Sequence, residues 1–307
     1  MQFTISKSFL ATIVVSLFFT TSHAQNYVDL FKINYANVFK AGYEDSDTTT
    51  NVQLSDVSLL YPIKLNEKVA IITGIDYSQQ NLSLYPNAAK TSLSNMTFKA
   101  GLSIKHSEKL SGSYVFLPRL SSEDFHTNGN DMFFGGIIIM KYQKTENFQW
   151  RFGAYGSTEG FGVLVTPVFG LHYLSTNKKF EATVNLPINA DLNYIIEEST
   201  SVGFQLQTPV KSYSLKANEL GIENYVQVSN IEFGPYFETR FLKNSLLLRL
   251  QAGYTTISYE AFQEGDTLPI RLSAVEFGDD RTLLNPTMTG NLFARIGCIY
   301  RFHLNKK

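Results

Sequence analysis

Acidic, amide and histidine side chains that could carry out catalysis or bind a metal gather in one stretch, residues 123–131. Carboxylates and an imidazole can act as general acids and bases, and carboxylate and amide oxygens can hold Ca²⁺. Their spacing matches no metal-binding loop motif, so solvated loop charge is the favoured interpretation, with an enzyme or calcium site as the alternative. The residues concerned are Glu123, Asp124, His126, Asn128, Asn130 and Asp131.

Motifs of common catalytic centres are absent from the rest of the sequence. There is no Gly-x-Ser-x-Gly, no His-Glu-x-x-His and no phosphate-binding loop. The single cysteine, Cys298, can form neither an internal disulfide nor a paired-cysteine metal site. His172 has no serine at strand spacing beside it, so a histidine that faces the lumen is the plainer interpretation. The sequence therefore predicts no enzyme, no metal and no cofactor.

A second set of charged residues repeats on one face of the three segments 231–241, 246–254 and 291–304. Segments consecutive in the chain usually pair in a sheet, so we expect these charges to lie close together. They predict either a charged constriction that selects solutes or a salt-bridge network that braces the fold, and the second interpretation is slightly favoured. The residues are Glu232, Glu238, Arg240, Arg249, Arg295 and Arg301.

The last of these segments, Asn291 to Leu304, has a period of two, which predicts a β-strand because successive side chains point to opposite faces. A soluble sandwich would bury its uncharged face against another sheet, whereas a transmembrane barrel would turn that face to lipid. The uncharged face holds Leu292, Ala294, Ile296, Cys298, Tyr300, Phe302 and Leu304, and the other holds Asn291, Phe293, Arg295, Gly297, Ile299, Arg301 and His303.

The same alternation recurs along almost the whole chain and favours the membrane. The alternating segments run for about 10 to 15 residues, longer than soluble strands and sufficient to cross a bilayer at a tilt. Aromatic residues recur near the ends of the apolar faces, as the interfacial girdles of membrane barrels require. These aromatic residues are Tyr142, Phe148, Trp150, Tyr173, Phe241, Tyr300 and Phe302.

The connections between these segments are of two kinds, which predicts a barrel with short periplasmic turns and longer external loops. Short connections carry lysine, at 64–68, 106–109, 143–146, 176–179 and 242–244. Longer connections carry acidic residues, at 44–47, 123–131 and 260–290.

The strand count depends on residues 180–196, which keep one parity throughout. They could form one strand that contains Pro187, or two strands around a turn at 187–189, because a three-residue turn preserves parity. In the first case a further strand would have to come from Leu268 to Val275. Both routes predict an all-β, antiparallel, up-and-down transmembrane barrel of about 14 strands, with 12 as the alternative, because such barrels use even counts.

Residues 1–24 have the pattern of a signal peptide, with Lys7 before an apolar stretch and Ser22-His23-Ala24 before the expected cut. The remaining residues, 25–307, are predicted to form one barrel domain. Overall charge is nearly balanced, with 26 Lys and Arg against 27 Asp and Glu, which argues against nucleic acid as a partner.

The segment Arg295-Ile-Gly-Cys-Ile-Tyr-Arg-Phe302 resembles the C-terminal assembly signal of Gram-negative outer-membrane β-barrels. It departs from the usual pattern because residues 303–307 follow the aromatic residue. The resemblance implies a member of an uncharacterised barrel family in the cell outer membrane, with residues 295–302 read by the barrel-assembly machinery. It carries no catalytic residues.

Two functions are compatible with such a barrel. A barrel of about 14 strands is wider than side chains alone can fill, which predicts a passive or selective pore for small solutes. The alternative is a structural or surface-interaction barrel with a plugged lumen and no transport. In both cases the predicted partner is the lipid bilayer of the outer membrane.

Overall fold

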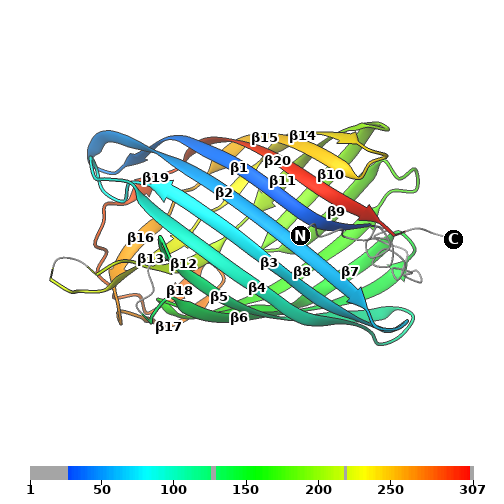
Figure 1. Cartoon of the computed structure of the whole chain (residues 1–307), viewed down its shortest axis with the longest axis horizontal. Helices are drawn as coiled ribbons and strands as arrows, with labels where there is room; N and C mark the ends of the chain where they lie inside the picture. Colours follow the sequence, from blue (N-terminus) through cyan, green and yellow to red (C-terminus); the bar gives the residue numbers. More distant parts are fainter. Residues whose placement is uncertain (1–26, 126–128, 218–219, 305–307) are drawn as a thin grey trace, which may run out of the picture.

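The computed structural model describes residues 27–125, 129–217 and 220–304, and these residues form strands, turns and loops without a helix. Fourteen antiparallel strands close into a barrel (Figure 1). The last strand returns to the first, with Tyr27 opposite His303, so the wall has no free edge. The predicted fold class and the strand number of about 14 are both confirmed.

Most wall strands follow one another in sequence, and the wall passes directly from β11 to β14 and from β15 to β20. The wall strands are β1 (Tyr27–Tyr43), β2 (Ser46–Lys64), β3 (Val69–Leu82), β4 (Thr91–Lys105), β5 (Leu110–Glu123), β6 (Met132–Thr145), β7 (Phe148–Glu159), β8 (Gly162–Leu174), β9 (Phe180–Leu186), β10 (Asn189–Glu197), β11 (Thr200–Gln207), β14 (Glu232–Phe241), β15 (Leu246–Thr255) and β20 (Asn291–His303).

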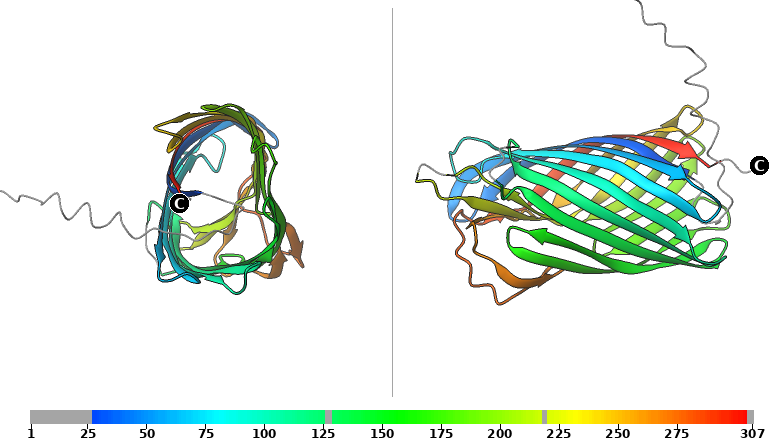
Figure 2. Two further views of the ribbon diagram at one scale, coloured as in Figure 1. Left: turned by 90° about the vertical axis from the view of Figure 1, so that its right-hand side faces the viewer. Right: turned by 60° about the horizontal axis from the view of Figure 1, so that its bottom comes forward.

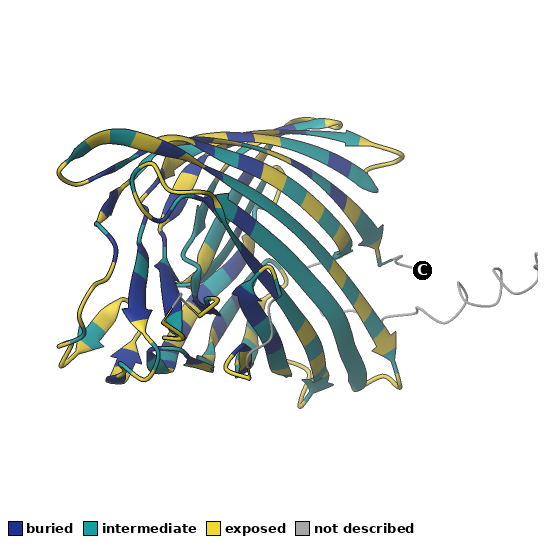
Figure 3. Ribbon diagram, turned by 60° about the vertical axis from the view of Figure 1, so that its left-hand side comes forward, coloured by how far each residue is buried: buried dark blue, intermediate teal, exposed yellow. Residues whose placement is uncertain are grey.

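The outer face of this wall is apolar. Exposed and buried residues alternate along the strands (Figure 3), and the exposed positions include Phe237 at 46%, Leu250 at 49% and Ile296 at 47%. Aromatic rings line up on β7, β8 and β9 near one rim, where Trp150 contacts Phe148 at 4.8 Å between ring centroids. A closed barrel with this apolar surface and aromatic girdle is a membrane-spanning barrel of the outer-membrane type.

The two rims differ as the loop pattern predicts. At the rim where β1 begins and β20 ends, the connections 65–68, 106–109, 146–147, 175–179, 198–199 and 242–245 are all short. The opposite rim carries the longer connections, including two insertions at 208–231 and 256–290. The stretch 44–47 lies at that rim as expected, but it forms a tight turn rather than a long loop. We call the rim of the termini the periplasmic rim and the other the outer rim.

Residues 180–196 form two strands, β9 and β10, joined by a tight turn that begins at Pro187. The two-strand interpretation is therefore the one that holds. Residues Leu268–Leu272 do form a strand, β17, but it pairs in parallel with β8 outside the succession of wall strands. No wall strand from this segment is needed to bring both ends of the barrel to one rim.

The two insertions fold together within the outer half of the barrel, which the sequence did not predict. Strands β12 (Val210–Ser214), β13 (Asn224–Ser229) and β16 (Tyr259–Gln263) form an antiparallel sheet, here called the inner sheet. In the end-on view of Figure 2 (left), the yellow-green ribbon of this sheet lies inside the barrel. The second insertion also contains β17 (Leu268–Leu272), β18 (Val275–Phe277) and β19 (Met288–Thr289), the last of which pairs with β1.

Apolar side chains hold the inner sheet against the wall. Val226, Val228 and Tyr259 of the inner sheet pack in one buried cluster with Val52 and Leu93 of the wall. Burial of such side chains contributes about 1.5–3 kcal/mol each, so this cluster fixes the inner sheet in place. Within the described residues, no helix is long and apolar enough to cross a membrane. The predicted signal peptide, residues 1–24, lies outside the described residues.

Candidate functional site: the charged lumen

A polar cavity of about 430 Å³ occupies the lumen below the inner sheet. It extends from Tyr27 and Arg301 near the periplasmic rim to Pro209 and Lys211 at the inner sheet. Its lining includes six basic and six acidic side chains, so the cavity has no strong preference for either sign of charge. The basic residues are Lys32, Lys211, Arg240, Arg249, Arg295 and Arg301, and the acidic ones are Asp29, Asp56, Glu181, Asp191, Glu232 and Glu238.

Arg249 on β15 is the centre of the ionic network in this cavity. Its guanidinium group donates to Glu238 on β14 at 2.8 Å and to Asp191 on β10 at 2.7 Å. The same group lies over the ring of Tyr236, 3.7 Å from the ring centroid. Two carboxylates and an aromatic face hold this cation, which is the arrangement that a planar guanidinium favours.

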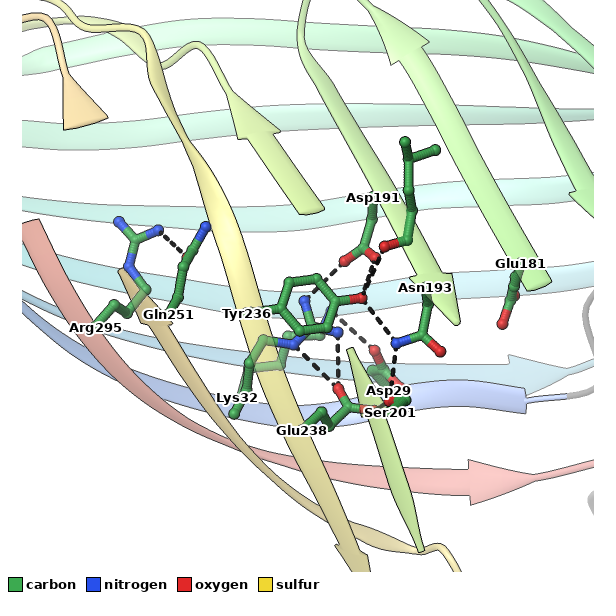
Figure 4. A network of polar contacts seen from close by, with 12 residues as sticks. Asp29, Lys32, Glu181, Asp191, Asn193, Ser201, Tyr236, Glu238, Gln251 and Arg295 are labelled. Atoms are coloured by element: carbon green, nitrogen blue, oxygen red, sulfur yellow. Dashed lines mark hydrogen bonds and ion pairs between the residues drawn. The ribbon is translucent and has the colours of Figure 1, made fainter. Parts of the chain in front are cut away.

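Tyr236 extends the network along the inner face of the wall to β10 (Figure 4). Its hydroxyl donates to Asp191 at 2.6 Å and accepts from the side-chain amide of Asn193 at 2.9 Å. Arg240 donates to Asn193 and to the hydroxyl of Ser201. These contacts join β10, β11 and β14 through buried polar groups that have found partners, as low-dielectric surroundings require.

Two further ion pairs lie on β20. Arg295 pairs with Glu232 on β14, and its guanidinium also donates to the side-chain oxygen of Gln251 at 3.2 Å. Near the periplasmic rim, Arg301 pairs with Asp29 on β1 at 2.7 Å and lies over the ring of Tyr27. The Arg301 pair ties the closing strand to its neighbour β1, whereas Arg295 bonds to the neighbouring β15 through Gln251 and reaches beyond it to β14.

All six charged residues predicted from the sequence line this cavity, and their three strands are neighbours in the wall. Every one of them has a partner of opposite charge, as the bracing interpretation expects. Sequence reasoning missed Asp29, Asp191 and Tyr236. The period-two pattern places Asp29 and Tyr236 on the inner face of the wall. Asp191 lies on β10, which does not pair with β15, so no strand pattern could have linked Asp191 to Arg249.

The wall and the inner sheet meet at a buried carboxylate. Glu159 at the end of β7 accepts from Arg119 on β5 and from the backbone N–H of Ser212 on β12, both at 2.6 Å. Gln80 on β3 contacts two tyrosines of the inner sheet, accepting from Tyr259 at 2.6 Å and donating to Tyr213 at 3.2 Å. The inner sheet is therefore attached to the wall by polar bonds as well as by the apolar cluster.

The acidic loop at 123–131 makes contacts at the outer rim. Lys216 donates from its side chain to Asp124 at 3.0 Å and from its backbone to Glu123, and the first bond lowers the pKa of the Asp124 carboxyl. Asn130 donates to Glu223 at 2.8 Å. Asp131 is buried, while His126 and Asn128 lie outside the described residues. Across the described ranges, no group of His, Cys, Asp and Glu is arranged to hold a metal.

His172 on β8 is fully buried on the inner face of the wall, and its Nδ1 lies 3.0 Å from the hydroxyl of Thr183. This agrees with the interpretation of His172 as a histidine that faces the lumen. The lumen as a whole can solvate polar solutes and bind charged groups through its ion pairs.

Comparison with known proteins places the chain in a family and shows similar barrels. The model of a domain of unknown function (DUF6268) matches residues 20–270, and the chain belongs to that family. No curated protein matches the sequence.

Several solved structures resemble it at low identity. An outer membrane channel from Pseudomonas putida F1 shares 9% identity over 92% of this chain and 99% of its own, with a TM-score of 0.47. The P. putida toluene transporter TodX shares 10% over 89% of each chain, with a TM-score of 0.37. Pseudomonas aeruginosa OccK7 shares 9% over 90% of this chain and 99% of its own, with a TM-score of 0.34.

Proposed function

We propose that this member of the DUF6268 family is an outer-membrane channel for small polar solutes, held closed in this conformation by its inner sheet. The observation that carries the proposal is the polar cavity of about 430 Å³, which runs through the lumen from the periplasmic rim to the inner sheet. This volume lies within the range of about 300–1,000 Å³ that small-molecule sites in proteins occupy.

The path through the outer half would open by movement of the inner sheet. Its three strands have 5, 6 and 5 residues and belong to the two insertions rather than to the wall. Displacing them breaks the pairing of β12 with β5 but leaves the hydrogen bonds between the fourteen wall strands intact, so the barrel itself need not unfold when the path opens.

Conductance measurements test this proposal directly. The purified full-length chain is reconstituted in planar lipid bilayers, and uptake of small sugars and amino acids is followed in liposomes. Brief openings are expected for the wild type, and longer ones for variants in which the inner sheet is loosened at Glu159. Absence of both conductance and solute uptake in wild type and loosened variants would refute the channel.

The second candidate is a structural or surface-interaction barrel with a permanently plugged lumen. It is favoured by the burial of Tyr213, Tyr225 and Tyr259 in the inner sheet, and by the pairing of the predicted lumen charges. In this case the outer rim is the working surface, and the loosened variants lose stability without gaining conductance.

Two segments of the sequence, at the two ends of the chain, bear on its export and assembly. We propose cleavage after Ala24, a single barrel domain in residues 25–307, and recognition of residues 295–302 by the barrel-assembly machinery. N-terminal sequencing of the protein recovered from outer membranes tests the cut. Replacing Phe302 with Ala tests the assembly signal, and accumulation of the unassembled chain is the expected result.

A further inference from the structure

Two basic residues lie directly opposite each other on the inner wall, outside the cavity described above. Lys141 on β6 and Arg151 on β7 are paired in register. Arg151 is buried at 7% exposure, whereas its chain neighbour Phe152 is 43% exposed and faces lipid. Residues paired across antiparallel strands point to the same face, so Lys141 also points into the lumen.

This pair differs from the arginines of the ionic network in the groups that it contacts. Arg151 donates to the side-chain oxygen of Gln149 at 3.3 Å, which is a neutral acceptor. Throughout the described residues, neither Lys141 nor Arg151 forms an ion pair with an acidic side chain, in contrast to Arg249 and Arg301.

The wall around this pair carries mostly basic and neutral side chains on its inner face. At this level the inward positions of β4 to β8 hold no Asp or Glu. On the adjoining strand β9, Glu181 acts electrostatically on Arg151, but its carboxylate accepts from the hydroxyl of Tyr27 at 2.8 Å and forms no ion pair with Arg151. The side of the lumen formed by β1, β10, β14, β15 and β20 carries paired charges instead. The inward residues near the pair are Ser103, Lys105, Ser111, Ser113, Ile139, Gln143, Gln149, Gly170 and His172.

Two like charges directly opposite each other destabilise a sheet, and a buried charge without a counter-ion is costly. An arrangement of this kind is stabilised when an anion occupies it. A guanidinium group binds carboxylate or phosphate oxygens through paired hydrogen bonds, and a nearby ammonium adds a point charge. Hydroxyl groups at Ser111 and Ser113, on the strand that pairs with β6, add further hydrogen-bond donors to this part of the wall.

We propose that Lys141 and Arg151 form a binding site for an oxyanion, the carboxylate or phosphate group of a small solute, on the lumen wall near the periplasmic rim. The inference rests on the proposed function only in that the solute reaches the site through the lumen. It adds the class of solute, because unpaired basic groups on a channel wall favour anions over cations.

Binding can be measured without conduction. The full-length barrel in detergent is titrated with inorganic phosphate and, separately, with succinate, at constant ionic strength against chloride. We expect either oxyanion to raise the thermal unfolding midpoint in a saturable manner. Lys141→Gln and Arg151→Gln should each weaken apparent affinity about tenfold or more, the usual effect of losing one charge-assisted bond.

Lys144→Gln is the matched control, since Lys144 is an exposed residue of the same strand, and it should bind as the wild type does. If Arg151→Gln fails to fold, the oxyanion titration of Lys141→Gln alone tests the site. A response to chloride equal to that for the oxyanions, or equal binding by all three variants, would overturn the site. Oxyanion binding without any conductance would support the site and refute the channel. Conductance without oxyanion binding would support the channel and refute the site.

Discussion

Glu159 on the barrel wall accepts a hydrogen bond from the backbone N–H of Ser212 in the inner sheet, with 2.6 Å between oxygen and nitrogen. The same carboxylate pairs with Arg119 and accepts from the hydroxyl of Ser157. Its side chain is fully buried, so both charges of the pair lack water. One carboxylate therefore holds two wall strands and the inner sheet together.

Replacing Glu159 with Gln should loosen the inner sheet. The change leaves Arg119 buried without a counter-charge, and breaking a buried pair in this way costs about 3–5 kcal/mol. If the proposed channel opens by displacement of the inner sheet, open probability in planar bilayers should rise. Glu146→Gln, in the periplasmic turn between β6 and β7, is the control and should leave conductance unchanged. A folded but less stable variant with no gain in conductance would favour the plugged structural barrel.

Arg249→Met should destabilise the lumen network more than Arg240→Met does. Arg249 is bonded to Glu238 and Asp191, whereas the contacts of Arg240 are longer, 3.3 Å to Glu238. Removing Arg249 leaves two carboxylates in the lumen without their main partner, for which we expect a loss of about 3 kcal/mol or more in the free energy of unfolding. Urea unfolding in liposomes measures both variants. Equal losses would mean that water, rather than Arg249, neutralises these carboxylates.

Asp279 should make the stability of the outer rim depend on pH in the acid range. Hydrogen bonds from Arg281 lower the pKa of Asp279 to about 2, and Arg281 also donates to Tyr225 and Gln227 of the inner sheet. Because the folded pKa lies below the unfolded value of about 3.9, the stabilisation is present above pH ~4 and is lost as pH falls towards ~2.

Proteolysis of the 264–286 segment by pepsin tests this prediction. Cleavage in the wild type should accelerate between pH 4 and pH 2 beyond the change in intrinsic protease activity. In Asp279→Asn the segment should already be cleaved quickly at pH 4, whereas Asp280→Asn, the adjacent exposed position, should behave as the wild type does. A wild-type rate that does not change with pH would show that the Asp279–Arg281 contact does not hold this segment.

Much of the wall follows from the sequence because its pattern is repeated and local. Period-two alternation places Phe237 outside and Glu238 inside without knowledge of their partners. Consecutive strands pair, so β14, β15 and β20, which share the predicted charges, could be brought together once the insertions were treated as loops. The ambiguity at Pro187 was one of turn geometry, which parity alone does not resolve.

The inner sheet could not be predicted in this way because its strands are short and its partners are distant. Val226 and Val228 alternate with Tyr225 and Gln227, but both sets are buried, so no face of β13 has the exposed side that marks a wall strand. The bond from Tyr259 to Gln80 joins residues 179 positions apart. The position of Lys141 directly opposite Arg151 likewise depends on strand register and not on any motif.

The membrane orientation of the wall is tested by adding a charge to its outer face. Leu250 on β15 is 49% exposed on the apolar surface, whereas Leu242 is 70% exposed in the periplasmic turn before that strand. Arg at a lipid-facing position near the bilayer midplane costs about 2–4 kcal/mol, and the cost falls to about 0–1 kcal/mol near the interface. Leu250→Arg should therefore lower the free energy of unfolding in liposomes by the larger amount, and Leu242→Arg by little or nothing. Equal small effects of the two substitutions would mean that the apolar face of β15 is exposed to water instead of lipid.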